Sequence, residues 1–313
     1  MVAAFPEPDF CTNLMHSGGS RLEAIFGSAR GIDSIPMLSL GSLDLKQRIA
    51  TRLVTPEIEA LVASIPKPLG SFGYDPWGYN EDTFKVALGA ARLLYDHYFR
   101  VTAHGLENIP SEGRVLIVGN HSGQLPMDGA LVGVAAATNP FGPRLARAMI
   151  ERFFPTVPWL GNFLNALGGV IGDPVNCSKM LDMDEAIIVF PEGVRGSGKL
   201  YKKRYQLQRF GNGFMHLAMN HRAPIVPVGI VGCEETMPAL ANLSPIAKLL
   251  GLPYLPIVPS LLPLPARVYL NFGKPMHFSP AASEAEVTER VEDVKAELRT
   301  LIQAGLAERT SIY

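Results

Sequence analysis

The stretch from Val115 to Gly129 restricts what this chain can fold into more than any other part of it. It opens with apolar residues at 115–118, three of which are β-branched, and such a short run is typical of a buried strand. A Gly-Asn pair then ends the run, and His121 follows at once. Asp128 comes seven residues after His121, just before an apolar run that predicts a helix. The stretch therefore predicts a strand, a polar turn and a helix, with a histidine and a carboxylate between the two elements.

His121 and Asp128 are residue types that suit proton transfer. A neutral imidazole can take a proton near neutral pH, and a carboxylate can fix its tautomer and stabilise the imidazolium that forms. The alternative is a histidine in an ordinary loop, with its hydrogen bonds satisfied and no catalytic role. This stretch alone leaves both interpretations open.

Two further motifs follow along the chain. Residues 189–196 read Val-Phe-Pro-Glu-Gly-Val-Arg-Gly and close an apolar run, and residues 223–229 read Ala-Pro-Ile-Val-Pro-Val-Gly. Together and in this order, the three stretches resemble the glycerolipid acyltransferase family, in particular its lysophosphatidic acid acyltransferases. That family carries an Asn-His-(four residues)-Asp motif, a Phe-Pro-Glu-Gly-Thr-Arg-Ser motif and a Val-Pro-Val strand. The resemblance covers residues 98–275, and it is specific in the combination of motifs although each motif alone is weak.

Predicted strands alternate with predicted helices, which indicates an α/β fold with a sheet flanked by helices on both faces. The family resemblance implies a mixed, mostly parallel sheet of the glycerol-3-phosphate acyltransferase type. We assign residues 81–313 to this acyltransferase domain and residues 1–80 to a helical and irregular N-terminal extension, partly disordered or wrapped around the domain. The main expected strands are 144–150, 168–171, 185–190, 225–231 and 267–272, and the main expected helices are 82–100, 129–138, 205–220 and 283–307.

The spacing between His121 and Asp128 departs from the family pattern. The family has four residues between them, which places both side chains on one helical face, whereas this chain has six. Pro126 indicates a loop that returns Asp128 to His121. The resemblance implies that His121 is the general base and that Asp128 orients it, and we expect the two side chains to meet through this loop.

The residues that resemble the Phe-Pro-Glu-Gly-Thr-Arg-Ser motif are expected to contact substrate. The resemblance implies that Glu192, Gly193 and Arg195 lie at the acceptor's phosphate, and a planar guanidinium can bind phosphate through two hydrogen bonds. Lys199, in the basic run that follows, is expected to bind substrate as well. The alternatives are a surface Glu–Arg pair for the motif and a solvated basic face for the run, and the run could equally meet lipid headgroups or the phosphates of coenzyme A.

Two other expectations concern the same site. Backbone N–H groups of Ser122, Gly123 and Gln124, or of the turn at Gly193, are candidates to stabilise the oxyanion that forms during acyl transfer. Substitutions relative to the family remove polar groups that would otherwise meet a phosphate. Val194 and Gly196 stand in place of the family Thr and Ser, and Asp173 stands where the family often has Arg.

The predicted function is transfer of a fatty acyl group from acyl-CoA or acyl carrier protein to a glycerolipid hydroxyl. Lysophosphatidic acid is the acceptor that the family resemblance favours. A neutral acceptor such as mono- or diacylglycerol is the alternative that the lost polar groups favour. A hydrolase, and a non-catalytic lipid-binding protein of the same fold, are further alternatives. We expect no metal and no cofactor beyond the acyl thioester, which acts as co-substrate.

The composition of the chain restricts the kinds of binding partner and the location that we expect. The formal net charge of −1 gives no overall attraction to nucleic acid, and the three cysteines show neither metal spacing nor a disulfide framework. We expect no signal peptide and no membrane-spanning helix, hence a cytoplasmic protein peripheral to a membrane. The apolar stretch 249–265 holds five prolines, so it cannot form a regular helix. We interpret it as a loop that either dips into a membrane surface or covers the core.

Overall fold

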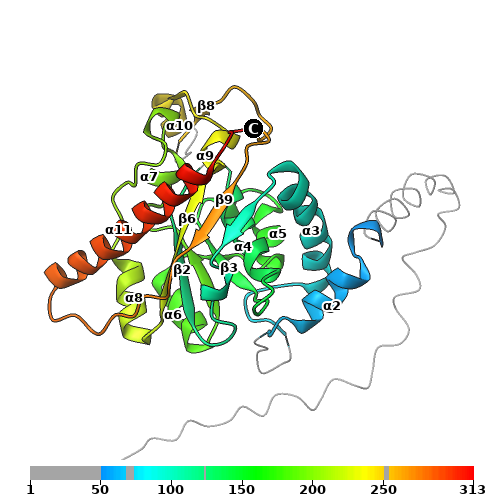
Figure 1. Ribbon diagram of the computed structural model, residues 1–313, viewed down its shortest axis with the longest axis horizontal. Helices are drawn as coiled ribbons and strands as arrows, with labels where there is room; N and C mark the ends of the chain where they lie inside the picture. Colours follow the sequence, from blue (N-terminus) through cyan, green and yellow to red (C-terminus); the bar gives the residue numbers. More distant parts are fainter. Residues whose placement is uncertain (1–50, 68–73, 123–124, 250–253) are drawn as a thin grey trace, which may run out of the picture. The chain divides into compact units, whose positions relative to one another are not determined.

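A seven-stranded sheet forms the centre of the computed structural model, which describes residues 51–67, 74–122, 125–249 and 254–313 (Figure 1). All neighbouring strands are parallel except the pair β6–β9, which is antiparallel. The expected mixed, mostly parallel sheet is therefore confirmed. In spatial order the strands are β1 (Thr102–His104), β9 (Tyr269–Phe272), β6 (Ile225–Val231), β2 (Val115–Gly119), β5 (Ala186–Val189), β3 (Ala146–Ile150) and β4 (Val170–Ile171).

Helices cover both faces of this sheet, and a small antiparallel pair of strands, β7 (Ala241–Asn242) and β8 (Pro256–Ile257), lies apart from it. The α-helices are α2 (Pro56–Ser64), α3 (Glu81–Leu93), α4 (Met127–Ala137), α5 (Leu160–Ala166), α6 (Pro174–Asp182), α7 (Val194–Ser197), α8 (Gly213–His221), α9 (Cys233–Thr236), α10 (Ser244–Leu249) and α11 (Glu284–Glu308). Single turns of other helix types span Leu94–Tyr98 (π) and Leu106–Asn108, Phe154–Thr156 and Tyr201–Lys203 (3₁₀).

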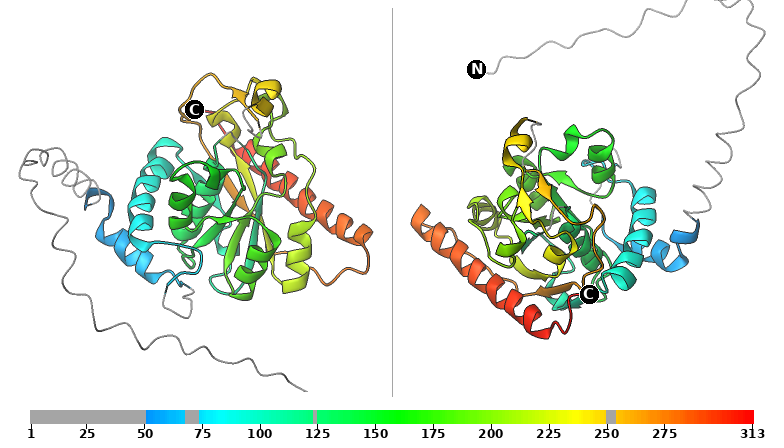
Figure 2. Two further views of the ribbon diagram at one scale, coloured as in Figure 1. Left: turned by 180° about the vertical axis from the view of Figure 1, so that it is seen from behind. Right: turned by 90° about the horizontal axis from the view of Figure 1, so that it is seen from above.

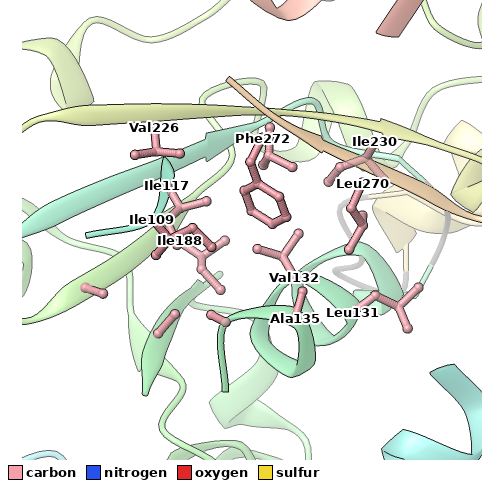
Figure 3. Packing of buried hydrophobic residues seen from close by; sticks show 14 of the residues in the cluster. Ile109, Ile117, Leu131, Val132, Ala135, Ile188, Val226, Ile230, Leu270 and Phe272 are labelled. Atoms are coloured by element: carbon pink, nitrogen blue, oxygen red, sulfur yellow. The ribbon is translucent and has the colours of Figure 1, made fainter. Parts of the chain in front are cut away.

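The core has two layers because alternate residues of each strand point to opposite faces. On one face, Ile117 of β2 packs with Ile188, Val226 and Leu270 against α4 (Figure 3). On the other face, Leu116 and its neighbours pack against α6, α8 and α11, and Figure 2 shows α11 running along the outside of that layer. A strand covered on both faces must be apolar at every position, which explains the uninterrupted apolar run at residues 115–118.

Two expected helices differ from the structure by more than two residues at one end. The helix expected over 82–100 begins at Glu81, because the side chain of Asn80 caps it by accepting a hydrogen bond from Thr83 N at 2.9 Å. It gives way to the π turn after Leu93. The helix expected over 205–220 begins only at Gly213. Backbone N–H groups in the preceding segment donate to glutamates elsewhere in the chain, so they are not used in helical hydrogen bonds.

Part of the predicted N-terminal extension makes close contacts with the sheet, while residues 1–50 and 68–73 lie outside the described chain. Arg147 of β3 is completely buried and forms ion pairs with Asp75 and Glu185. The indole Nε1 of Trp77 donates to the other oxygen of Glu185 at 3.0 Å. These contacts attach the segment around residues 75–77 to the starts of β3 and β5.

None of the helices in the described part of the chain has the length and apolarity needed to cross a membrane.

Candidate active site

Three polar residues lie where neighbouring parallel strands end. His121 follows β2, Glu151 follows β3, and Glu192 comes shortly after β5. Since β2 and β3 both pair in parallel with β5, the carboxyl ends of these strands meet at one edge of the sheet. That edge is the usual place for ligands in open α/β sheets.

The expected contact between His121 and Asp128 is present. The ring Nδ1 lies 2.6 Å from Asp128 Oδ2, which also accepts a hydrogen bond from Ser122 N at 2.9 Å. The other oxygen accepts from Gly129 N at 2.8 Å, so the buried carboxylate is fully engaged. With Nδ1 donating to Asp128, Nε2 is the nitrogen that can take a proton.

The local chain path explains how six intervening residues still allow this contact. Helix α4 begins at Met127, with Pro126 at its N-cap, so Asp128 lies in the first helical turn. A carboxylate there is stabilised by the positive end of the helix dipole. The loop after β2 therefore absorbs the two extra residues and returns Asp128 to the histidine.

An aromatic ring fixes the other side of the imidazole. Phe190 stacks on His121 with 4.5 Å between ring centroids and 17° between the planes. A Cβ atom at Gly119 would lie 3.1 Å from the Phe190 ring, and one at Gly129 would lie 3.4 Å from it. Both glycines therefore leave room for the ring that supports the histidine.

Glu192, expected to lie at the acceptor's phosphate, is buried beside His121 and accepts hydrogen bonds from two segments of the main chain. Its side chain is buried; Oε1 accepts from His121 N at 2.9 Å and Oε2 from Gln208 N at 2.7 Å. Glu192 thus has both oxygens engaged by backbone N–H groups. It joins the end of β2 to the segment before α8.

Lys199, expected to bind substrate, is buried among carboxylates. Its side chain is 3% exposed, and its ammonium lies 3.0 Å from Glu234 Oε1 and 3.8 Å from Glu192 Oε2. Arg195, by contrast, is exposed and forms no ion pair with any described residue, so the alternative of a surface Glu192–Arg195 pair is also wrong. Of the residues expected to bind phosphate, Arg195 alone is a cation that the described structure leaves open to solvent.

Two of the expected oxyanion donors, Ser122 N and Gly193 N, are engaged elsewhere. Ser122 N donates to Asp128, and Gly193 N donates to the carbonyl of Phe190 at 2.9 Å. Gly193 has φ 53° and ψ −145°, a conformation open essentially to glycine alone, and it turns the chain from β5 into α7. Gly123 and Gln124 lie outside the described residues.

Gly196, which replaces the family Ser, is required by packing. A Cβ atom built on it would lie 2.7 Å from the Cβ atoms of both His121 and Glu192. No side chain fits there without displacing the histidine or Glu192. The short helix α7 therefore approaches the His121 loop more closely than a serine would permit.

The electrostatics of the site favour the protonated form of the histidine. Burial by itself lowers the pKa of His121, but the charge and hydrogen bond of Asp128, followed by the charges of Glu192 and Glu151, outweigh it. The pKa of His121 therefore lies above its ordinary value of 6.5. A raised pKa gives the neutral ring a stronger pull on a proton.

Sequence reasoning gave no role to three residues that shape the site. Asn120 is buried and bridges β2 to β6, since its side chain donates to Ile230 O at 3.0 Å and accepts from Ile230 N at 2.8 Å. Phe190 supports the imidazole, and Tyr254 packs on Gly198 and hydrogen-bonds Ser197. Asn120 and Phe190 lie within the recognised motifs, which was an available signal. Tyr254 lies beyond them in a Pro-rich stretch and carried none.

No three His, Cys, Asp or Glu side chains of the described chain are grouped so that they could hold a metal ion.

Comparison with known proteins gives consistent matches. The family model named Acyltransferase matches residues 100–231. An uncharacterized protein of Mycobacterium tuberculosis is 35% identical over 256 residues, which cover 77% of this chain and 70% of that protein. A Gallus gallus protein named DGAT1/2-independent enzyme synthesizing storage lipids is 29% identical over 235 residues, or 72% of this chain and 68% of that protein. The crystal structure of the 1-acyl-sn-glycerophosphate (LPA) acyltransferase PlsC from Thermotoga maritima aligns with a TM-score of 0.49 at 19% identity, covering 74% of this chain and 83% of that one.

Proposed function

The chain belongs to the acyltransferase family, and from this premise we propose that it moves a fatty acyl group from a thioester to a hydroxyl of a glycerolipid, with His121 as the general base. The observation that carries the proposal is the 2.6 Å contact between His121 Nδ1 and Asp128. Because the buried carboxylate of Asp128 holds Nδ1, the ring has a fixed orientation and Nε2 can take a proton.

The proposed reaction uses these groups in sequence. Nε2 of His121 takes the proton of the acceptor hydroxyl as the hydroxyl oxygen attacks the thioester carbonyl carbon. Asp128 stabilises the imidazolium. Collapse of the tetrahedral intermediate breaks the carbon–sulfur bond, and the departing thiolate takes the proton from His121. A positioned base of this kind contributes about 10²–10⁴-fold, and the remaining acceleration comes from holding the two substrates together.

The acyl donor is acyl-CoA or acyl carrier protein, and we propose no cofactor beyond that thioester. Lysophosphatidic acid is the acceptor that the family motifs imply. A neutral glyceride is the second candidate, and two observations favour it. Lys199 is buried in an ion pair, and Asp173, in place of the family Arg, caps α6 by accepting from Val175 N and Asn176 N at 2.9 Å. The Gallus gallus relative, named for storage-lipid synthesis, fits the same candidate.

Replacement of the base tests the proposed chemistry. We expect His121→Ala to lower acyl transfer by at least about 10²-fold, because the attacking hydroxyl keeps its proton, while binding of the lipid acceptor persists. The assay follows labelled acyl-CoA with lysophosphatidic acid, monoacylglycerol and diacylglycerol. His216→Ala, a change at a half-exposed histidine of α8, is the matched control.

Other results would favour the alternatives. Unchanged transfer by His121→Ala excludes the base assignment. Release of free fatty acid by the wild type, with no acylated acceptor, indicates a hydrolase. Lipid binding without any turnover indicates a non-catalytic lipid-binding protein.

We also propose that the chain works as a peripheral protein at a membrane surface, where its lipid acceptor resides. Exposed apolar side chains gather on either side of β7, on α10 and β8, and on the segment after β8. We call them the apolar rim: Leu240, Leu243, Ile246, Ile257, Leu261 and Leu262. The exposed cations Lys202, Lys203 and Arg204 lie close by, since Tyr201 N donates to the carbonyl of Ala239 at 2.9 Å. Apolar groups bordered by cations suit an anionic lipid surface.

Liposome flotation tests this membrane proposal. Leu261 and Leu262 are 87% and 75% exposed, so Leu261→Ser with Leu262→Ser should weaken flotation with anionic vesicles without unfolding the chain. Phe141→Ser, at a 63% exposed ring between α4 and β3, is the control and should float as the wild type does. Equal flotation of the two variants would contradict a role for the apolar rim.

A further inference from the structure

Glu151 is a carboxylate beside the active site that the proposed mechanism does not use. It follows Ile150, the last residue of β3, at the same edge of the sheet as His121. Its Oε1 is buried, and no described residue gives it a hydrogen bond. A buried acceptor without a donor is unusual, since such groups are nearly always paired.

Glu151 shares its surroundings with the catalytic groups. Its charge and that of His121 act on each other: burial raises the pKa of Glu151, and His121 opposes that rise. Burial likewise raises the pKa of Tyr254, and the charges of Glu151 and Asp128 add to it. Glu151 is therefore close enough to His121 and to Tyr254 for its charge to act on both.

The free oxygen of Glu151 restricts what can bind there. An unpaired buried acceptor is stabilised by any ligand that donates a hydrogen bond to it. A hydroxyl can donate, whereas a phosphomonoester dianion offers no proton and repels a carboxylate. None of the described lysines or arginines forms an ion pair with Glu151 that would offset this repulsion, and Lys199 is paired with Glu234 and Glu192 instead. The site is thus suited to an uncharged polar group.

We propose that Glu151 is an acceptor-binding residue whose free oxygen takes a hydrogen bond from a second hydroxyl of an uncharged glyceride, next to the hydroxyl that is acylated. This inference rests on the proposed function and narrows it to neutral acceptors that carry at least two hydroxyls, such as monoacylglycerol. A site built to bind a hydroxyl rejects a ligand that lacks it far more strongly than an apolar site does.

Three acceptors with one acyl-CoA test the proposal: 1-monoacylglycerol, 1,2-diacylglycerol and lysophosphatidic acid. Diacylglycerol has no second hydroxyl, so Glu151→Leu should lower kcat/KM for monoacylglycerol about tenfold or more, mainly through KM, and change that for diacylglycerol less than about threefold. Glu151→Gln keeps an acceptor oxygen and removes the charge. It should restore most activity toward monoacylglycerol and raise kcat/KM for lysophosphatidic acid relative to the wild type.

Glu289→Gln, at an exposed carboxylate of α11, is the matched control and should change none of these ratios. Equal losses for all acceptors in both Glu151 variants, with unchanged thermal midpoints, would overturn the inference and leave the proposed function standing. A wild type that prefers lysophosphatidic acid to monoacylglycerol would overturn it as well. A wild type that acylates none of the three acceptors would overturn the proposed function itself.

Discussion

The orientation of His121 is determined by contacts from three directions. Its backbone N–H donates to Glu192, its ring donates to Asp128, and one ring face lies against Phe190. Asp128 lies in the first turn of α4, and Phe190 and Glu192 come shortly after β5. The imidazole is therefore held in position before any substrate arrives, which reduces the reorganisation needed at the moment of reaction.

Asp128→Asn tests the part that the carboxylate plays. The substitution preserves shape, but the amide can donate to Nδ1 and so favours the tautomer in which Nε2 carries the proton. We expect kcat to fall about 10²–10⁴-fold with little change in KM, measured by steady-state kinetics. A rise in KM with an unchanged kcat would contradict the orienting role.

The same variant should change the pH profile. The base works as neutral imidazole, so wild-type activity should decline as the pH falls below a pKa that lies above 6.5. Removing the Asp128 charge removes the largest contribution that raises the pKa, so the acidic limb of kcat/KM should move to lower pH. An acidic limb at the same pH in both proteins would assign it to a different group.

At the scale of elements, the sequence predicted the strands and the meeting of His121 with Asp128 because both depend on local pattern. The strand over 225–231 has the expected bounds. The positions of Glu192 and Lys199 were not predictable in this way. The two backbone N–H groups that donate to Glu192 lie 16 and 71 residues away along the chain. Lys199 pairs with Glu234, which follows β6. Only the folded arrangement shows that a motif carboxylate binds backbone N–H groups and that a lysine of a basic run turns inward.

The approach of α7 to the end of β2 gives a prediction at this scale. Gly196→Ser restores the family residue, yet its Cβ would lie 2.7 Å from His121 Cβ. We expect a loss of about 1–3 kcal/mol in the free energy of unfolding and lower activity, measured by urea denaturation and acyl transfer. Gly133→Ala, in α4 with no atom within 4 Å of the added carbon, is the control and should stabilise by about 0.5–1 kcal/mol. Full stability and activity in Gly196→Ser would show that α7 can move away.

At the scale of the whole molecule, the fold extends beyond the part that carries the motifs. The family match begins at residue 100, but Asp75 and Trp77 contact Arg147 and Glu185 inside the sheet layer. No periodicity in the sequence indicated this connection, because it joins residues that are about 72 positions apart through a buried ion pair. The stability of the seven-stranded sheet therefore depends partly on a segment that precedes the matched region.

Asp75→Ala measures that dependence. It leaves one side of the buried guanidinium of Arg147 without its partner, so we expect the free energy of unfolding to fall by about 3–5 kcal/mol in urea denaturation. Asp82→Ala, at a carboxylate that is 93% exposed, should change it by less than about 0.5 kcal/mol. Similar midpoints for the two variants would mean that the ion pair contributes little.

The two outermost strands of the sheet, β1 and β4, are three and two residues long. A neighbouring molecule that tried to add a strand there would find very few main-chain groups to pair with. Two copies of the chain that met at high concentration would thus have little opportunity to join their sheets, which disfavours fibrous aggregation through these edges.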